Sequence, residues 1–269
     1  MEFIFNLLEF EIETPTTFGW FHIMFLLITI LVTVLFIIKF KNPTEKFINR
    51  IFLIAGLLMF VLECYKQFVF TFSYEAFEVI SDYQWYSFPF QFCSVPMYVY
   101  LIIPFTKGKV RNALLCFSAS YSLFAGTAVM IYPGDVFIAT LGISIQTMIH
   151  HGLMVVMGVY LLVNRIVKVS IKTILSATVV FSIVLLIALL MNLTVIKFIP
   201  SDETFNMFFI SPYFDCTLPI LSIIYKKVPY IIFLFIYVFG FGLVAGLVNL
   251  IYYGIDRLVV KINVKQKSI

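Results

Sequence analysis

Charge is scarce in this sequence. Asp, Glu, Lys and Arg make up 12% of the 269 residues and 62% are hydrophobic, whereas roughly 25% of a soluble domain is charged. This composition excludes a water-soluble globular domain. Apolar stretches recur between Phe18 and Tyr253. At about 20 residues each, they can cross a hydrocarbon layer of about 30 Å as helices. We predict an all-α fold, a polytopic membrane helix bundle.

Cysteine and histidine are also scarce. The four cysteines show no C-x-x-C or other paired spacing: Cys64, Cys93, Cys116 and Cys216. This argues against a disulfide framework and against a zinc site. None of the three histidines has a carboxylate partner close by in the sequence. We therefore expect no metal and no cofactor.

Hydropathy predicts about seven transmembrane helices within a single integral membrane domain, residues 1–269. They cover residues 18–38, 51–72, 86–105, 112–132, 141–163, 173–196 and 230–253. Pro89, Pro96 and Pro104 punctuate the third span. Carbonyl groups freed by proline must find partners inside the protein. We therefore expect that span to be a kinked, buried helix.

Basic residues divide unevenly between the predicted loops. One side of the membrane receives 14 of the 18 Lys and Arg residues, in the loops 39–50, 107–111 and 165–172 and from Arg257 onward; the other receives three. The positive-inside rule then places the N-terminus outside and the C-terminus in the cytoplasm. The first 17 residues are acidic, unlike the positive start of a cleavable signal peptide, so we expect 18–38 to remain a span. The expected location is the cell membrane, multi-pass.

The same basic clusters bear on the partners of the chain. Lys and Arg that flank spans set topology and attract anionic headgroups, and the sequence shows no RNA or DNA module. We expect membrane lipids as partners, with a phospholipid as the candidate substrate, and no nucleic acid. The sequence leaves the oligomeric state open.

Polar side chains within the spans are the functional candidates, because an ionisable group at membrane depth costs at least about 2.5 kcal/mol. Glu63 and Lys66 lie three residues apart on one helix face and can neutralise each other. The other candidates are His22, Gln91, Cys93, Gln146, His150, His151 and Asn192. Gln146 shares a helix face with His150. Interhelical structural roles remain the alternative for all of them.

Cys93 and the His150–His151 pair are predicted at overlapping depths. At about 1.5 Å per residue, Cys93 lies about 10 Å and His151 about 15 Å from the outer side. A thiol in an apolar place is normally inert, but a neighbouring imidazole can take its proton during attack on a carbonyl. The two histidines point about 100° apart, and their spacing alone does not choose between them.

Three stretches carry a family resemblance. FPFQFCSVPMYVYL (88–101), IQTMIHHGLMVVMGVYLL (145–162) and MNLTVIKFIPSDETFNMFFISP (191–212) together resemble the YwaF family of bacterial integral membrane proteins. That family pairs a Pro-x-x-x-Cys-Ser element with a later His-Gly and then two asparagines ahead of a proline. The match follows most of the chain in order and in hydropathy.

The resemblance implies a site and an activity. The family is distantly similar to animal multi-spanning proteins linked to acyl transfer between glycerophospholipids, in which a Cys and a His form the proposed catalytic pair. Carried over, these are Cys93 and His151, the histidine that precedes Gly152. The later polar positions fall on Asn192 and Asn206, and His22 fits a further family position.

The leading hypothesis is a thiol-dependent lipid acyltransferase or acyl hydrolase. Cys93 would attack an acyl ester, and His151 would act first as base and then as acid. Asn192 or Gln91 could donate to the oxyanion, and His22 or Glu63 could orient the imidazole.

Two alternatives stay open at this stage. A small-solute or proton-coupled transporter would use Glu63, Lys66 and the histidines as a relay. A non-enzymatic membrane assembly protein would use the polar groups only to join helices, and it should tolerate Cys93→Ser.

Orientation is directly testable. Single cysteines introduced at Ser73 and at Lys109 should be labelled from opposite sides of the membrane, with position 73 outside, because basic loops stay in the cytoplasm. Accessibility to an impermeant thiol reagent in intact cells measures this. Labelling of both positions from one side would contradict the predicted topology.

Overall fold

The structure is a computed structural model that describes residues 2–134 and 136–267. Within that part of the chain, six helices are long and apolar enough to cross a membrane. Five are single helices: α2 (Trp20–Lys39), α3 (Glu45–Val69), α7 (Leu141–Val163), α8 (Ile171–Thr194) and α10 (Tyr230–Lys267). The sixth is continuous over Gly108–Ile131 and consists of α5 (Gly108–Phe117), the π-helical turn η3 (Ser118–Ser122) and α6 (Leu123–Ile131). A short 3₁₀ turn, η4 (Val195–Phe198), extends α8. The chain is a multi-pass helical membrane protein.

The third predicted span differs from its prediction. The range 86–105 is not one kinked helix: after the 3₁₀ turn η1 (Trp85–Ser87), residues 88–94 are irregular, and only α4 (Val95–Ile102) and η2 (Ile103–Phe105) are helical. Proline explains the break. Phe88 adopts φ −47° and ψ 134° before Pro89, because a residue that precedes proline avoids the helical region. Pro96 lies in the first turn of α4, where its missing N–H costs little.

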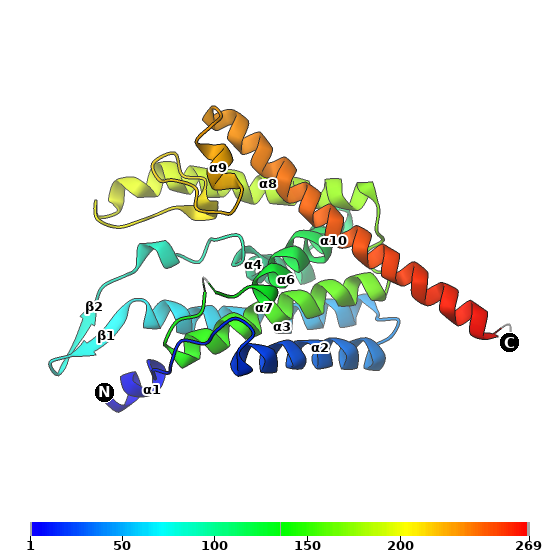
Figure 1. The fold of residues 1–269 in the computed structure, drawn as a ribbon, viewed down its shortest axis with the longest axis horizontal. Coiled ribbons are helices and arrows are strands. Elements are labelled where there is room, and N and C mark those ends of the chain that lie inside the picture. Colours follow the sequence, from blue (N-terminus) through cyan, green and yellow to red (C-terminus); the bar gives the residue numbers. More distant parts are fainter. Residues whose placement is uncertain (1, 135, 268–269) are drawn as a thin grey trace.

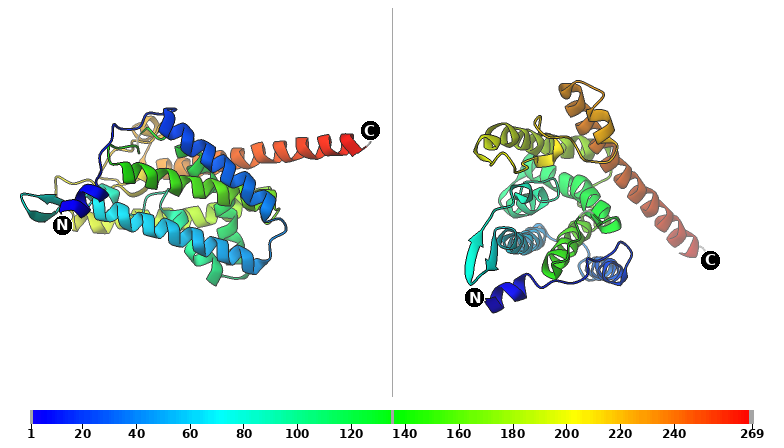
Figure 2. Two further views of the ribbon diagram at one scale, coloured as in Figure 1. Left: turned by 90° about the horizontal axis from the view of Figure 1, so that it is seen from below. Right: turned by 60° about the vertical axis from the view of Figure 1, so that its left-hand side comes forward.

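The helices are arranged around α7. Helix α7 packs against α2, α3 and α6, while α3 packs on α4 and α5 packs on α8. Helix α10 crosses over α8, η3 and α6 (Figures 1 and 2). Glycines allow the closest approach: a Cβ at Gly126 would lie 2.8 Å from the His151 carbonyl oxygen, and one at Gly152 would lie 2.8 Å from Thr29 Oγ1. Small residues at such contacts are typical of membrane helix packing.

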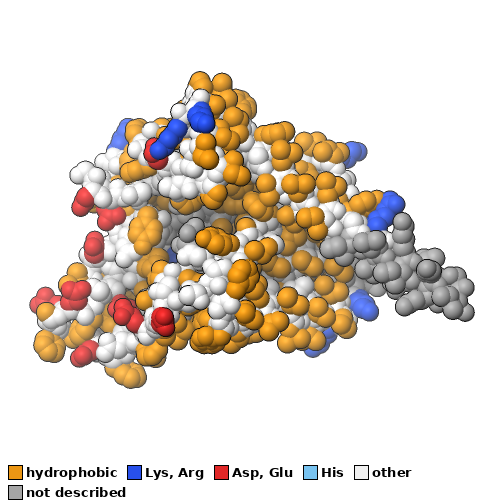
Figure 3. Space-filling view, viewed as in Figure 1, with side chains coloured by type: hydrophobic (Ala, Val, Ile, Leu, Met, Phe, Trp, Pro, Cys, Tyr) orange, Lys and Arg blue, Asp and Glu red, His pale blue; other side chains and the backbone are white. Residues whose placement is uncertain are grey.

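Charged side chains gather at opposite ends of the molecule. Figure 3 shows Asp and Glu at the end that carries the N-terminus and the β-hairpin, with Lys and Arg at the far end and a smaller group above. Apolar side chains cover the face between the two ends, as on a lipid-facing surface. This separation of charge agrees with the uneven division of Lys and Arg between the predicted loops. The orientation across the membrane stays a prediction.

The acidic end carries the small elements of the fold. Helix α1 (Glu2–Leu8) places Phe5 against Phe68 and Tyr74, and the Tyr65 hydroxyl donates to the Leu8 carbonyl. Strands β1 (Phe72–Glu75) and β2 (Glu78–Ser81) pair antiparallel around a turn with positive φ at Ala76 and Phe77. This hairpin is the departure from the all-α expectation. Two further short elements, η5 (Met207–Phe209) and α9 (Leu221–Tyr225), lie in the chain between α8 and α10.

The contact between α6 and α7 is testable at Gly126. Gly126→Ala should destabilise the fold by about 1–3 kcal/mol, because the new methyl group meets the α7 backbone rather than a flexible side-chain end. Gly240→Ala is the matched control, since a Cβ there meets nothing within 4 Å. Thermal unfolding in detergent compares the two variants. Equal midpoints for both would contradict the packing described.

Candidate functional site

Cys93 lies in the irregular segment 88–94, just before α4, and its side chain is partly buried. Its neighbour Phe92 anchors the segment in an aromatic cluster. The Phe92 ring lies 5.1 Å from the ring of Phe241, 5.5 Å from that of Phe181 and 5.9 Å from that of Phe208. Rings at such distances attract each other beyond simple burial. The backbone at Cys93 is thereby held in the core although it is not helical.

Two amide side chains join this segment to a second irregular loop, residues 206–211. Gln91 accepts a hydrogen bond from the Phe208 N–H at 2.8 Å and donates to the Asn206 carbonyl at 3.1 Å. Asn192 accepts from the Met207 N–H at 2.8 Å and donates to the Met207 carbonyl at 2.9 Å. Both amides therefore supply the backbone partners that the loop lacks. Each amide thus uses its oxygen and one of its two N–H groups on the loop.

Asn206 completes the loop from within. Its Oδ1 accepts from the Ser211 N–H at 2.8 Å, and its Nδ2 donates to the Asp215 carbonyl at 3.3 Å. Phe208 and Phe209 both have positive φ, near 57°, a conformation that is uncommon for non-glycine residues and persists only when the surroundings hold it. Asn206 is thus a positioning residue for the loop that lies against Cys93.

The histidines of α7 meet the Cys93 segment. His150 Nε2 lies 2.8 Å from the Cys93 carbonyl oxygen. A carbonyl only accepts, so Nε2 carries the proton and Nδ1 keeps a free lone pair. His151 Nδ1 lies 2.7 Å from the Thr147 carbonyl, so by the same reasoning its Nε2 is the free nitrogen. The third and fifth predicted spans therefore meet at Cys93, and His150 rather than His151 makes the direct contact.

Both free imidazole nitrogens are buried. His150 is 3% and His151 7% exposed, and their rings are 5.3 Å apart. His150 Nδ1 and His151 Nε2 have no hydrogen-bond partner among the described residues. Likewise, no hydrogen bond within the described chain joins Cys93 Sγ to either ring. Two buried proton acceptors without partners, on the helix that contacts the Cys93 backbone, are candidates for proton transfer, because buried polar groups are otherwise nearly always paired.

Glu63 and Lys66 form the ion pair that their spacing predicts. Lys66 Nζ lies 2.7 Å from Glu63 Oε1, and the Glu63 side chain is 5% exposed. Gln67 also donates to Glu63, at 2.8 Å, and to the Ser87 carbonyl. Tyr83 donates to Gln67. The network ties α3 to the segment that leads to Cys93, and within it Glu63 has no contact with an imidazole.

Lys66 is linked to the Cys93 segment through this network, because Gln67 bonds both Glu63 and the Ser87 carbonyl. Gln67 was not singled out by the sequence. Its position four residues after Glu63, on the same helix face, was the available signal.

His22 and Gln146 play other parts. His22 is fully buried; it accepts from the Phe18 N–H and lies 2.8 Å from the Met130 carbonyl, so it joins the start of α2 to the end of α6. Its partners leave it no contact that orients His151. Gln146 is buried on α7, and its Oε1 accepts a hydrogen bond from the Thr147 hydroxyl at 3.4 Å.

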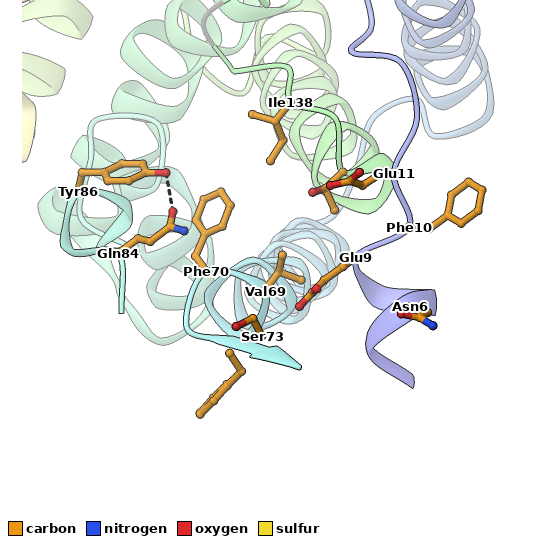
Figure 4. Close-up of a pocket in the computed structure, with 12 residues that line it drawn as sticks. Asn6, Glu9, Phe10, Glu11, Val69, Phe70, Ser73, Gln84, Tyr86 and Ile138 are labelled. Carbon is orange, nitrogen blue, oxygen red and sulfur yellow. Dashed lines mark hydrogen bonds between the residues drawn. The ribbon is translucent and has the colours of Figure 1, made fainter. Parts of the chain in front are cut away.

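A separate pocket of about 660 Å³ opens at the acidic end. Figure 4 shows Glu9 and Glu11 of the N-terminal segment on one side, and Gln84 hydrogen-bonded to Tyr86 on the other. Burial, and then the charges of Glu11 and Glu75, raise the pKa of Glu9. None of the residues that line this pocket belongs to the Cys93 site.

Comparison with known proteins assigns the family. Residues 17–253 match the family model of the TMEM164 family, which is most of the chain. The chain belongs to the TMEM164 family. No curated protein and no solved structure matches it. The match includes α2 through the membrane-length part of α10, and with them every residue of the Cys93 site.

The ion pair of this TMEM164-family protein is testable by a mutant cycle. Glu63→Gln leaves Lys66 without its counter-charge and should cost roughly 3 kcal/mol, because breaking a buried pair exposes an uncompensated charge to a poor solvent. The double variant Glu63→Gln, Lys66→Gln should be more stable than either single variant. Thermal unfolding in detergent measures all three. Additive losses would show that the two charges do not depend on each other.

Proposed function

We propose that this protein is a membrane-embedded thiol acyltransferase that moves an acyl chain between glycerophospholipids. The observation that carries the proposal is the contact of His150 with the Cys93 carbonyl, which brings the Cys93 segment to the part of α7 where His150 and His151 each keep a free, buried ring nitrogen. A thiol needs a base within reach to become a nucleophile in an apolar place. The resemblance of the Cys-Ser and His-Gly elements to the YwaF family, which is distantly similar to an acyl-transfer group, supports the same chemistry.

The first step forms a thioester. The Cys93 thiol passes its proton to His151 Nε2 while Sγ attacks the ester carbonyl carbon of the donor lipid. The carbon–oxygen bond of the ester then breaks. The leaving glycerol oxygen takes the proton from His151, and a lysophospholipid departs. His151 thus returns to its neutral form with Nε2 free.

The second step delivers the chain. The hydroxyl of an acceptor lysophospholipid passes its proton to His151 Nε2 and attacks the thioester carbonyl. The carbon–sulfur bond breaks, and the Cys93 sulfur takes the proton back from His151. With water in place of the acceptor, the same sequence is an acyl hydrolysis. Neither route needs a metal or a redox partner.

His150 is a positioning residue in this mechanism. Its Nε2–H is committed to the Cys93 carbonyl, which fixes the nucleophile's own peptide unit beside α7. Gln91 and Asn192 are engaged with the 206–211 loop. The Cys93 N–H donates to no acceptor among the described residues, so it is the donor we assign to the oxyanion.

A place for the acyl chain adjoins this segment. An apolar cavity of about 570 Å³ lies between α4, α5 and α8 and is lined by Phe90, Val95 and Tyr98 on the Cys93 side. Apolar side chains of this kind pack against a hydrocarbon chain through van der Waals contacts. The cavity therefore supports an acyl group held beside the nucleophile.

Matched glutamine substitutions distinguish the proposed base, His151, from the positioning residue, His150. Gln keeps an N–H donor but is a poor proton acceptor. His151→Gln should therefore lower acyl transfer by about 10²–10⁴-fold, whereas His150→Gln, which can still donate to the Cys93 carbonyl, should retain activity within about tenfold. Purified protein in nanodiscs receives a phospholipid with a fluorescent acyl chain and an unlabelled lysophospholipid. Transfer of the label and the intact mass of the Cys93 adduct are measured.

Cysteine variants complete the test. Cys93→Ala should abolish transfer and the adduct, while Cys116→Ala, at a buried thiol outside the site, should preserve both. Lipid turnover that is unchanged in Cys93→Ala would refute the enzyme. A folded wild-type protein that turns over no glycerophospholipid would instead favour the transporter or the assembly protein.

A further inference from the structure

A small cavity of about 240 Å³ lies at the basic end of the molecule, apart from Cys93. Its wall comes from α5, from the loop between α7 and α8 and from the first two turns of α8. Helix α7 ends and α8 begins at the end of the bundle opposite the N-terminus (Figure 1). We call this space the lysine cavity; its lining includes Asn112, Lys168, Lys172, Thr173 and Ser176. The proposed acyl transfer assigns no role to it.

Both lysines of the lysine cavity lack a counter-charge. Neither Lys168 nor Lys172 forms an ion pair with any residue that the structure describes. No Asp or Glu belongs to the described part of the lining either. The Thr173 hydroxyl donates to the Lys168 carbonyl, which holds the loop that carries Lys168 against the first turn of α8, where Lys172 lies. Two unpaired positive residues therefore border one small space, and an anion is the occupant that neutralises them.

The neutral groups of the cavity also suit an anion. Asn112 and Ser176 each carry a hydrogen-bond donor. Asn112 makes only a long contact of 3.7 Å, from Nδ2 to Cys116 Sγ, so its amide has donor capacity left. The first turn of the 24-residue helix α8 lines the cavity, and the positive end of a helix dipole attracts negative charge. Several donors and two cations around a small space match the oxygens of a phosphate group.

The position of the lysine cavity favours a phosphate that is carried by a lipid. Lys172 is the last charged residue before the uncharged stretch 173–196 of α8, so the cavity lies where headgroups meet hydrocarbon. Ser176 lines both the lysine cavity and the apolar cavity between α4, α5 and α8. The phosphate site therefore borders a space in which a hydrocarbon chain can lie.

Charge and volume narrow the headgroup. A phosphate monoester carries about −1.5 to −2 charges at neutral pH, whereas a diester carries about one. Two lysines without counter-charges match the monoester. The volume of about 240 Å³ is below the roughly 300–1,000 Å³ of typical small-molecule pockets. It suits a bare phosphate better than a phosphate that carries a sugar or an inositol ring.

We propose that the lysine cavity binds the phosphate of a lipid phosphomonoester, of the phosphatidate class, from the leaflet at the basic end. Lys168 and Lys172 neutralise the phosphate, and Asn112 and Ser176 donate to its oxygens. The competing interpretation is a diffuse attraction of anionic headgroups to all lysines at this end of the molecule. That attraction depends on the number of charges and not on which lysines carry them.

The experiment compares two lipids that differ by one methyl group on the phosphate. The purified full-length protein in detergent is titrated with phosphatidate and with phosphatidylmethanol of the same acyl chains, and bound lipid is counted by native mass spectrometry. Phosphatidate should bind about tenfold more tightly, because the methyl ester removes one charged oxygen that a lysine would contact. Equal affinities for the two lipids would overturn the proposal.

Matched lysine variants locate the site. The double variant Lys168→Gln, Lys172→Gln should bind both lipids equally weakly. The double variant Lys46→Gln, Lys107→Gln removes the same charge from exposed residues outside the lining, and it should keep the tenfold preference. All four lysines are exposed, so both variants should keep the thermal midpoint of the wild type. An equal loss of preference in the two variants would show diffuse attraction and refute the site.

Inorganic phosphate identifies the source of the ligand. It has the charge but no chain, so it should displace phosphatidate only at about hundredfold higher concentration, because the apolar contacts of the chain are missing. Displacement at equal concentration would assign the cavity to a soluble phosphate and refute the lipid. Cys93→Ala should bind phosphatidate as the wild type does, so this result does not depend on acyl transfer.

Discussion

The hydrocarbon core offers no water to the backbone, so every irregular peptide group within it needs a partner from the protein. This constraint organises the centre of the molecule. Residues 88–94 are irregular because of their prolines, and residues 206–211 are irregular because Phe208 and Phe209 adopt positive φ. Gln91 and Asn192 satisfy the second loop, and His150 satisfies the Cys93 carbonyl. Each polar side chain near Cys93 thus supports the backbone first.

These backbone contacts leave two imidazole nitrogens without a partner in the described chain. Once His150 Nε2 and His151 Nδ1 are used for carbonyl groups, the opposite ring nitrogens have no protein partner. Free acceptors in a poor solvent are tolerated where a substrate or a proton will meet them. The same reasoning separates His22, whose two nitrogens are both used, from the α7 pair. In the proposed mechanism, His151 does the chemistry and His150 supports the backbone, although the two are neighbours on one helix.

The acidic end, the middle and the side of the bundle carry different kinds of surroundings. The acidic end has a polar pocket between the N-terminal segment and the loop that holds Gln84 and Tyr86. The middle has Cys93, tied through Gln67 and Ser87 to the Glu63–Lys66 pair. The groove between α8 and α10 is lined almost entirely by apolar side chains. The three surroundings therefore differ in polarity.

The sequence by itself determined the membrane character, six of the spans within a few residues, the separation of charge and the Glu63–Lys66 contact, because hydropathy, loop charge and helical spacing are local properties. It also marked Cys93 and the histidines of α7 as candidates. Only the tertiary structure decided that residues 88–94 do not form a helix, that His150 holds the Cys93 carbonyl, and that Gln91, Asn192 and Asn206 serve a loop. Those outcomes depend on which groups from distant segments meet, and a hydrogen-bond partner 57 or 117 residues away leaves no periodic trace in the chain.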